Sequence, residues 1–181
     1  MKKIFVVLTC FLLVHSASHA QTYLARNGKI TFFSSTPVEN IEAVNNEVVS
    51  TINIPGGDLE FRLTVKSFHF PKTTMEEHFN NESYMNSNQF PKASFKGKLT
   101  KPVNVKANGT YNVMVEGDLT IKDVTKHLSV PAVITVTGDK LGAVARFKIK
   151  RKEFHVYGEA FTQSKLADDI EVTVNCAYDR M

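Results

Sequence analysis

Hydrophobic and polar residues alternate with a period of two along most of the chain. The longest run covers residues 111–121, where every second side chain is apolar or absent. Because successive side chains of a strand point to opposite faces, each run predicts a strand with one buried and one solvated face. Similar runs cover residues 59–66, 92–99, 128–136, 143–150 and 170–176, and shorter ones lie near Ile30 and Phe32 and from Val48 to Ile54.

Turn-forming residues separate these runs at Asn27-Gly28, Pro55-Gly56-Gly57, Asn108-Gly109 and Gly138-Asp139. About eight or more strands at this spacing, without a long linker, predict an all-β antiparallel barrel or sandwich. No internal repeat interrupts the pattern. The chain is therefore expected to form one domain.

One segment departs from the strand pattern. Residues 73–86 place Met75 and Phe79 at helical spacing, with Thr73 or Thr74 available as an N-cap and acidic residues in the first turn. We expect one short amphipathic helix across an end of the barrel.

The barrel interior is expected to be apolar, and it has two possible fillings. A barrel of about eight strands encloses packed side chains or one slender ligand. The chain contains 13 Phe and no Trp. Small residues at inward positions either leave a channel or let strands coil closely, which leaves both fillings open. These residues are Ala93, Gly97, Gly117, Ala132, Ala143 and Ala145.

The N-terminus has the order of features typical of a secretion signal. Lys2 and Lys3 precede an apolar run at 4–14, and Ser18-His19-Ala20 supplies small residues before Gln21. Residues 1–20 are thus expected to be a signal peptide and residues 21–181 a single periplasmic or secreted domain. The apolar run is too short to span a bilayer, which needs about 20 residues, so no membrane span is expected.

Charge and cysteine content narrow the candidate functions. The net charge of +4 is spread along the chain, which does not favour nucleic-acid binding. The densest basic cluster, 148–152, is interpreted as a solvated strand face, with a rim for an anionic head group as the alternative. Cys176 is the single cysteine after residue 20 and shares the phase of Ile170, Val172 and Val174, so we expect it to be buried.

No constellation for catalysis or metal binding is evident. The histidines His69, His78, His127 and His155 lack the close spacing of a local metal clamp. Nucleophile-elbow, P-loop and dinucleotide motifs are absent from the sequence. The sequence predicts no catalytic residue, metal or cofactor, and the chain is not expected to be an enzyme.

Three blocks of sequence resemble the YceI-like family. The first joins His78–Met85 to Gln89–Gly97, the second is Val115–Lys126 with its Gly-Asp-Leu-Thr-Ile run, and the third is Phe147–Phe154. The resemblance covers most of residues 21–181 in order. There are two departures, since Met75-Glu76 replace the family's usual Arg-Asp before the helix His, and Asp123 replaces a usual Gly.

The resemblance implies an exported, lipocalin-like antiparallel barrel that encloses a long isoprenoid or similar lipid in an apolar tunnel. The expected function is to sequester or carry such a molecule, a polyisoprenoid or quinone-like lipid, by burial rather than reaction. The alternative is a filled barrel that acts as a stress-response or protein-interaction module. The oligomeric state stays open, a homodimer included. Strand phase gives the candidate tunnel residues Phe32, Phe61, Leu63, Phe95, Val113, Val115, Ile134, Phe147 and Val172, with Phe79 and Tyr84 near the entrance.

Overall fold

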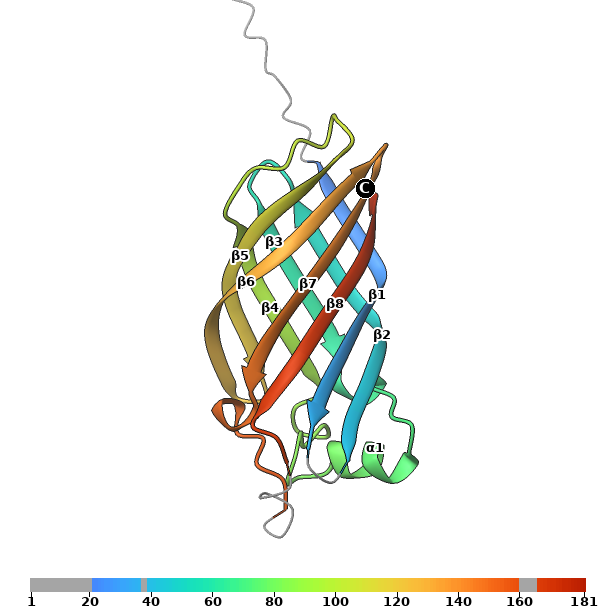
Figure 1. The fold of residues 1–181 in the computed structure, drawn as a ribbon, viewed down its shortest axis with the longest axis vertical. Helices are drawn as coiled ribbons and strands as arrows, with labels where there is room; N and C mark the ends of the chain where they lie inside the picture. The colour runs from blue at the N-terminus through green and yellow to red at the C-terminus, as the bar shows by residue number, and fades with distance from the viewer. Residues whose placement is uncertain (1–20, 37–38, 160–165) are drawn as a thin grey trace, which may run out of the picture.

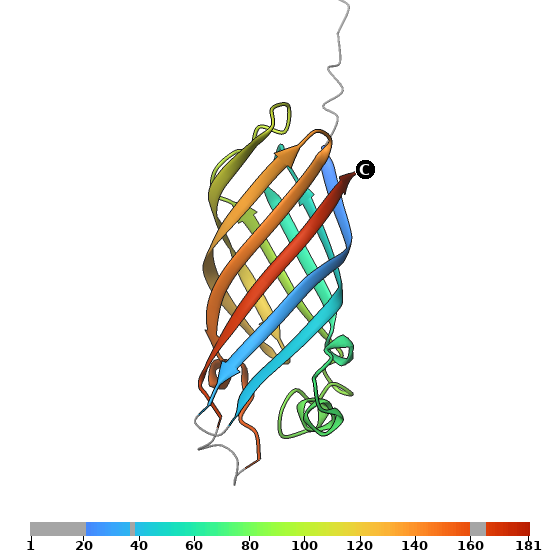
Figure 2. The ribbon, with the colours of Figure 1, turned by 45° about the vertical axis from the view of Figure 1, so that its right-hand side comes forward.

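Eight antiparallel strands form a closed barrel, with each strand hydrogen-bonded to its neighbours in chain order (Figures 1 and 2). The computed structural model describes residues 21–36, 39–159 and 166–181, so the expected signal peptide lies outside the described residues. The prediction of an all-β antiparallel barrel with one short helix is confirmed. The strands are β1 Thr22–Ser35, β2 Asn40–Asn53, β3 Asp58–Thr64, β4 Lys92–Leu99, β5 Gly109–Ile121, β6 Val124–Thr137, β7 Lys140–Lys150 and β8 Asp169–Arg180.

Two of the four expected turns lie between strands, and a third, Asn108-Gly109, stands at the start of a strand. Residues 54–57 connect β2 to β3, and Gly138 adopts a positive φ of 58° in the tight connection from β6 to β7. Gly109 is the first residue of β5. In each case a residue tolerant of turn conformations stands where the strand pattern breaks.

The expected turn at Asn27-Gly28 is wrong, because both residues lie inside β1. The register with β2 shifts on either side of Gly28, as at a β-bulge. A Cβ on Gly28 would lie 2.5 Å from the Cys176 sulfur, so glycine is needed for close packing rather than for a turn. Before the bulge the buried residues of β1 are at odd positions, Tyr23 and Ala25, and after it they are at even positions. This change explains why the sequence suggested only a shorter strand here.

The helix α1 covers Thr73–Asn80 and is shorter than expected. Lys72, extended at φ −121°, is its N-cap, and neither Thr73 nor Thr74 caps it. Asn81 ends the helix because its side chain accepts a hydrogen bond from the backbone N–H of Ser83 at 3.0 Å, which starts a turn. Figure 1 shows α1 at the end of the barrel opposite the C-terminus.

The glycine pair Gly97 and Gly117 allows β4 and β5 to approach closely and does not open a channel. The two residues are cross-strand partners. A Cβ on Gly117 would lie 2.3 Å from the carbonyl oxygen of Lys96, and one on Gly97 would lie 2.5 Å from that of Glu116. Of the two roles expected for small inward residues, these two serve tight coiling.

We expect Gly117→Ala to destabilise the barrel by about 1–3 kcal/mol, because the added methyl group overlaps backbone that cannot move independently. Gly142→Ala in β7 is the matched control, since its nearest neighbour, the Cβ of Thr135, would lie 4.0 Å away. Urea unfolding of both variants measures the difference. Equal stability of the two variants would contradict the close-approach explanation.

Candidate functional site

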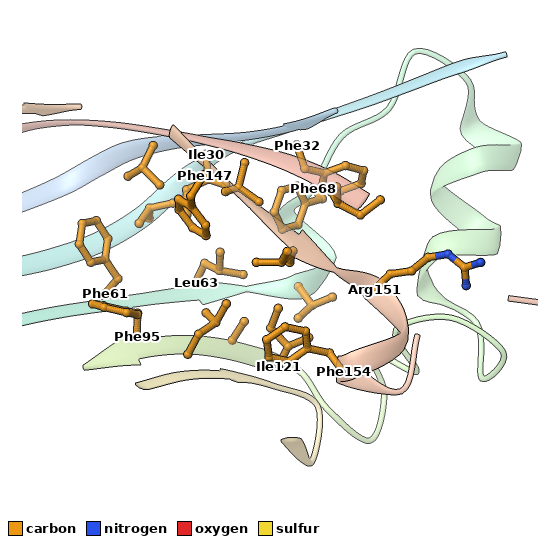
Figure 3. A pocket seen from close by; sticks show the side chains of 18 of the residues that line it. Ile30, Phe32, Phe61, Leu63, Phe68, Phe95, Ile121, Phe147, Arg151 and Phe154 are labelled. Atoms are coloured by element: carbon orange, nitrogen blue, oxygen red, sulfur yellow. The ribbon is translucent and has the colours of Figure 1, made fainter. Parts of the chain in front are cut away.

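A cavity of about 600 Å³ extends from the α1 end of the barrel inward as far as Ile52 and Tyr178. Figure 3 shows Phe61 and Phe95 deep in the cavity, with Phe32 and Phe68 nearer the helix. Phe61 and Phe95 come from β3 and β4 and pair across the ladder. The wall is almost entirely apolar, so the space suits a hydrocarbon better than water.

The opposite end of the barrel is filled. Tyr23, Ile52 and Tyr178 are each at most 2% exposed and belong to one continuous core, in which Ile52 and Tyr178 also form the inner end of the cavity. The hydroxyl groups of Ser50 and Tyr178 lie 2.8 Å apart, so the buried phenol is satisfied. The filled interior of the alternative hypothesis therefore describes only this end, and the cavity is a tunnel closed at its inner end.

Four phenylalanine rings pack together where α1 meets the barrel. Phe79 of α1 contacts Phe32 of β1 and also Phe68 and Phe70 from the segment before the helix, with ring centroids 5.1–5.6 Å apart. Phe32 also contacts Phe68 and Phe70. Such ring pairs each contribute about 0.5–1.5 kcal/mol beyond area burial. The phenyl cluster therefore holds the otherwise exposed helix across the tunnel mouth.

Most of the candidate tunnel residues lie at the cavity. Ten of the eleven candidate residues line the cavity, whereas Val113 does not. Val113 is 5% exposed and belongs to the core cluster. Binding of a ligand by the ten residues stays a prediction. They are Phe32, Phe61, Leu63, Phe79, Tyr84, Phe95, Val115, Ile134, Phe147 and Val172.

Several residues of the wall escaped the sequence analysis. Phe68 and Phe70 flank His69 in a segment without strand alternation, and Phe154 lies in the 3-10 helix η2, Arg151–Phe154. A period-two pattern cannot assign a face to residues outside strands. The one available signal was the density of phenylalanine between Val65 and Pro71.

Comparison with known proteins decides the family. The YceI-like domain model matches residues 13–178, which is most of the chain. The chain belongs to the YceI-like family. No curated protein matches it.

Solved structures agree with this YceI-like fold. A polyisoprenoid-binding domain from Saccharophagus degradans aligns with a TM-score of 0.74 at 12% identity, covering 90% of this chain and 99% of that one. BcnA from Burkholderia cenocepacia gives 0.69 at 18%, covering 83% and 95%. The YceI protein of Campylobacter jejuni gives 0.57 at 17%, covering 100% and 99%. At these identities the likeness establishes the lipocalin-like fold.

Arg151 corrects the expectation that residues 148–152 form a solvated face. Its side chain is only 6% exposed, and its guanidinium donates to the carbonyl oxygens of Ala167, Val156 and Tyr157 at 2.6–2.9 Å. Asp168 adds an ion pair at 3.2 Å. Figure 3 shows the guanidinium directed away from the cavity. Arg151 therefore ties together segments at the mouth of this YceI-like barrel.

Lys122 also connects loops at the α1 end of the barrel through hydrogen bonds. It lies in the β5–β6 turn at a positive φ of 55°, and its ammonium donates to the carbonyl oxygens of Tyr84 and His155, both at 2.9 Å. Partial burial lowers the pKa of Lys122, although nearby Asp123 opposes this shift. The N–H of Gly158 donates to Ser83 at 2.9 Å beside it. The loop after α1 is thus fastened to the barrel.

Three of the four candidate histidines each lie beside one carboxylate. His127 lies 2.8 Å from Asp118, His155 lies 3.3 Å from Asp123, and His69 lies 3.6 Å from Glu76. Among the described residues, no three His, Cys, Asp or Glu side chains gather as a metal site would require. Within the same residues, no helix is long and apolar enough to cross a membrane.

Proposed function

We propose that this protein is an exported carrier that sequesters an elongated apolar lipid, a polyisoprenoid or a quinone-like molecule, inside the barrel. The observation that carries the proposal is the apolar tunnel of about 600 Å³, filled at one end and bordered by α1 at the other. Its shape admits a narrow chain and leaves a polar end group near the mouth. A neighbouring structure described as a polyisoprenoid-binding domain supports this choice of ligand class.

The size of the tunnel fits a chain rather than a compact ligand. At about 30 Å³ for each water-sized group, the volume holds roughly twenty such groups. β8 borders the cavity from Ile170 to Tyr178, which corresponds to roughly 20 Å along the barrel axis at ordinary strand rise and tilt. Each buried methylene contributes about 0.8 kcal/mol. Burial alone would therefore give tight binding after the costs of ordering a flexible chain.

Polar groups around the mouth suit an amphiphile whose head group stays in water. Lys72, Thr74 and His78 border the cavity from the α1 side, and Glu39 pairs with Lys72. All four side chains are exposed. The mechanism would be burial of the tail without a chemical reaction.

Export follows from the N-terminal segment and has its own test. A signal peptide at residues 1–20 would deliver the barrel to the periplasm or the medium with Gln21 at its N-terminus. Fractionation of the producing cells, followed by N-terminal sequencing, measures this. Full-length protein retained in the cytoplasm would contradict export and leave the binding proposal untouched.

We expect a stoichiometric apolar species to accompany the protein purified from its native compartment. Native mass spectrometry should show a mass above that of the polypeptide, and the excess should disappear on denaturation. Extraction and identification of the released lipid would name the cargo. A polypeptide mass without an adduct, together with no binding of added isoprenoids or quinones, would overturn the carrier function.

A further inference from the structure

The hydrogen-bonded ladder between β6 and β7 stops halfway along the barrel. Its register runs from the pair Thr137–Lys140 to the pair Ala132–Ala145 and ends there. Both strands continue, because β5 pairs with β6 as far as Val124 and β8 pairs with β7 as far as Lys150. Figure 1 shows β6 and β7 adjacent at one end and diverging toward the end that carries α1. We name the stretch between residues 124–131 and 146–150 the β6–β7 seam.

Pro131 explains why the ladder ends at this point. The backbone oxygen of Met114 accepts a hydrogen bond from Thr100 on the β4 side, so Met114 directs its backbone away from β6. Met114 and Pro131 are cross-strand partners. In an antiparallel ladder, the backbone N–H and C=O groups of a non-hydrogen-bonded pair point away from the partner strand. The backbone of Pro131 therefore points toward β7. A proline has no N–H to donate at the first position where the ladder would have to continue.

The seam runs alongside the tunnel. Val130 of β6 lines the cavity on one side of it, and Phe147 and Ile149 of β7 line the cavity on the other. Phe154 of η2 also borders the cavity, is 2% exposed, and lies beside Ile121 in Figure 3. This ring therefore fills the interior near the α1 end of the seam.

The elements around the tunnel mouth, by contrast, are held in place by many contacts. The phenyl cluster packs α1 onto the barrel, while Lys122, Arg151 and the hydrogen bond between Gly158 and Ser83 fasten the adjoining loops. Each hydrogen bond contributes about 0.5–1.5 kcal/mol net, so lifting the whole mouth would cost several of them. Parting the strands along the seam breaks no ladder bond.

We propose that the β6–β7 seam is a lateral portal, through which the lipid chain enters and leaves the tunnel while the mouth stays fastened. The ring of Phe154 swings aside as the chain passes. The outer side chains along the seam, among them Ser129, Lys148 and Lys150, are exposed and polar, which protects the unpaired edges from pairing with other chains. This portal rests on the proposed carrier function and specifies how the carrier is loaded.

Three cross-linked cysteine pairs, called staples below, distinguish entry of the lipid through the seam from entry through the mouth. Ser129→Cys with Lys148→Cys places two outward thiols opposite each other across the seam, where continuation of the register would pair them. Glu116→Cys with Ser129→Cys shares one position and staples the fully paired β5–β6 ladder as a control. Glu39→Cys with Lys72→Cys staples the mouth at an existing ion pair. Oxidation closes adjacent thiols, and a bis-maleimide bridges thiols that stand further apart.

Stopped-flow fluorescence with a fluorescent farnesol analogue measures the uptake rate. We expect bridging of the seam pair to slow uptake by about tenfold or more relative to the same variant with free thiols. Bridging of the β5–β6 control pair or of the mouth pair should leave the uptake rate of that variant nearly unchanged. Pro131→Thr, which restores a backbone N–H that faces β7 and keeps its side chain on the outer face, should also slow uptake without changing the equilibrium affinity.

Two results would overturn the portal. Unaltered uptake with the seam stapled, or slowing by the mouth staple alone, would assign access to the mouth while leaving the carrier function intact. Failure of the unmodified protein to take up the probe would instead overturn the carrier function, and the portal with it.

Discussion

Replacing Ala145 with phenylalanine should weaken binding of an apolar chain by about a hundredfold while the barrel remains folded. Ala145 lies on β7 and lines the cavity between its cross-strand partners Ala132 and Val174. A ring at this position would occupy the middle of the tunnel and displace about four methylenes of a bound chain. At about 0.8 kcal/mol each, the loss is about 3 kcal/mol. The added ring packs into existing space, so the free energy of unfolding should not fall.

The control places the same ring on the outside of the neighbouring strand. Val133 of β6 is 38% exposed, and Val133→Phe adds a ring that faces solvent. Titration of the fluorescent farnesol analogue gives the affinities, and urea unfolding gives the stabilities. Equal affinities of the two variants would show that the tunnel is not the binding site, and a large loss of stability in Ala145→Phe alone would show that the space is not available.

The sequence predicted the barrel best where a strand keeps one phase along its length. In β5, residues Val113, Val115 and Gly117 are buried in strict alternation, as the sequence suggested. In β1 the bulge at Gly28 reverses the phase, and a packing contact with Cys176 decides this. That contact joins strands at opposite ends of the chain, so no local pattern reports it.

Strand phase predicted which side chains point into the barrel, but not which of them border the cavity. Alternation separates inward from outward side chains, which is why Phe61, Phe95 and Phe147 were assigned correctly to the wall. It cannot tell whether an inward residue borders the cavity or packs against other side chains of the core. Val113 belongs to the core and does not line the cavity, because large residues such as Tyr23 meet in the core from other strands.

Irregular segments limited the prediction further. Arg151 stands directly after the basic alternation of β7, and no local pattern indicates that the chain turns there into a 3-10 helix. The turn buries the guanidinium against backbone carbonyls contributed by residues 156, 157 and 167. These carbonyls come from irregular segments, whose positions depend on tertiary packing rather than on a residue pattern.

Alkaline pH should destabilise the barrel through a buried thiol at its filled end. Cys176 is 1% exposed, and burial raises the pKa of this thiol from 9.0 to about 11, partly offset by its hydrogen bond with Tyr178. The folded chain therefore holds the proton more tightly than the unfolded chain does. This contribution to stability is complete below pH 9.0 and is lost as the pH rises to about 11. The loss is about 3 kcal/mol at 1.36 kcal/mol for each unit of pKa.

The phenol of Tyr178 acts in the same direction at higher pH. Burial, with the nearby Cys176, raises the pKa of Tyr178 well above 10.0, although its hydrogen bond with Ser50 opposes the shift. The effect of Cys176 ionisation on the free energy of unfolding is therefore best measured between pH 9.0 and 10.0, below the usual titration of tyrosine. Urea unfolding under reducing conditions in this window should show stability falling in the parent protein and falling less in Cys176→Ala. Identical slopes would mean that Cys176 titrates normally, which requires water to reach the filled end, and the tunnel would then not be closed there.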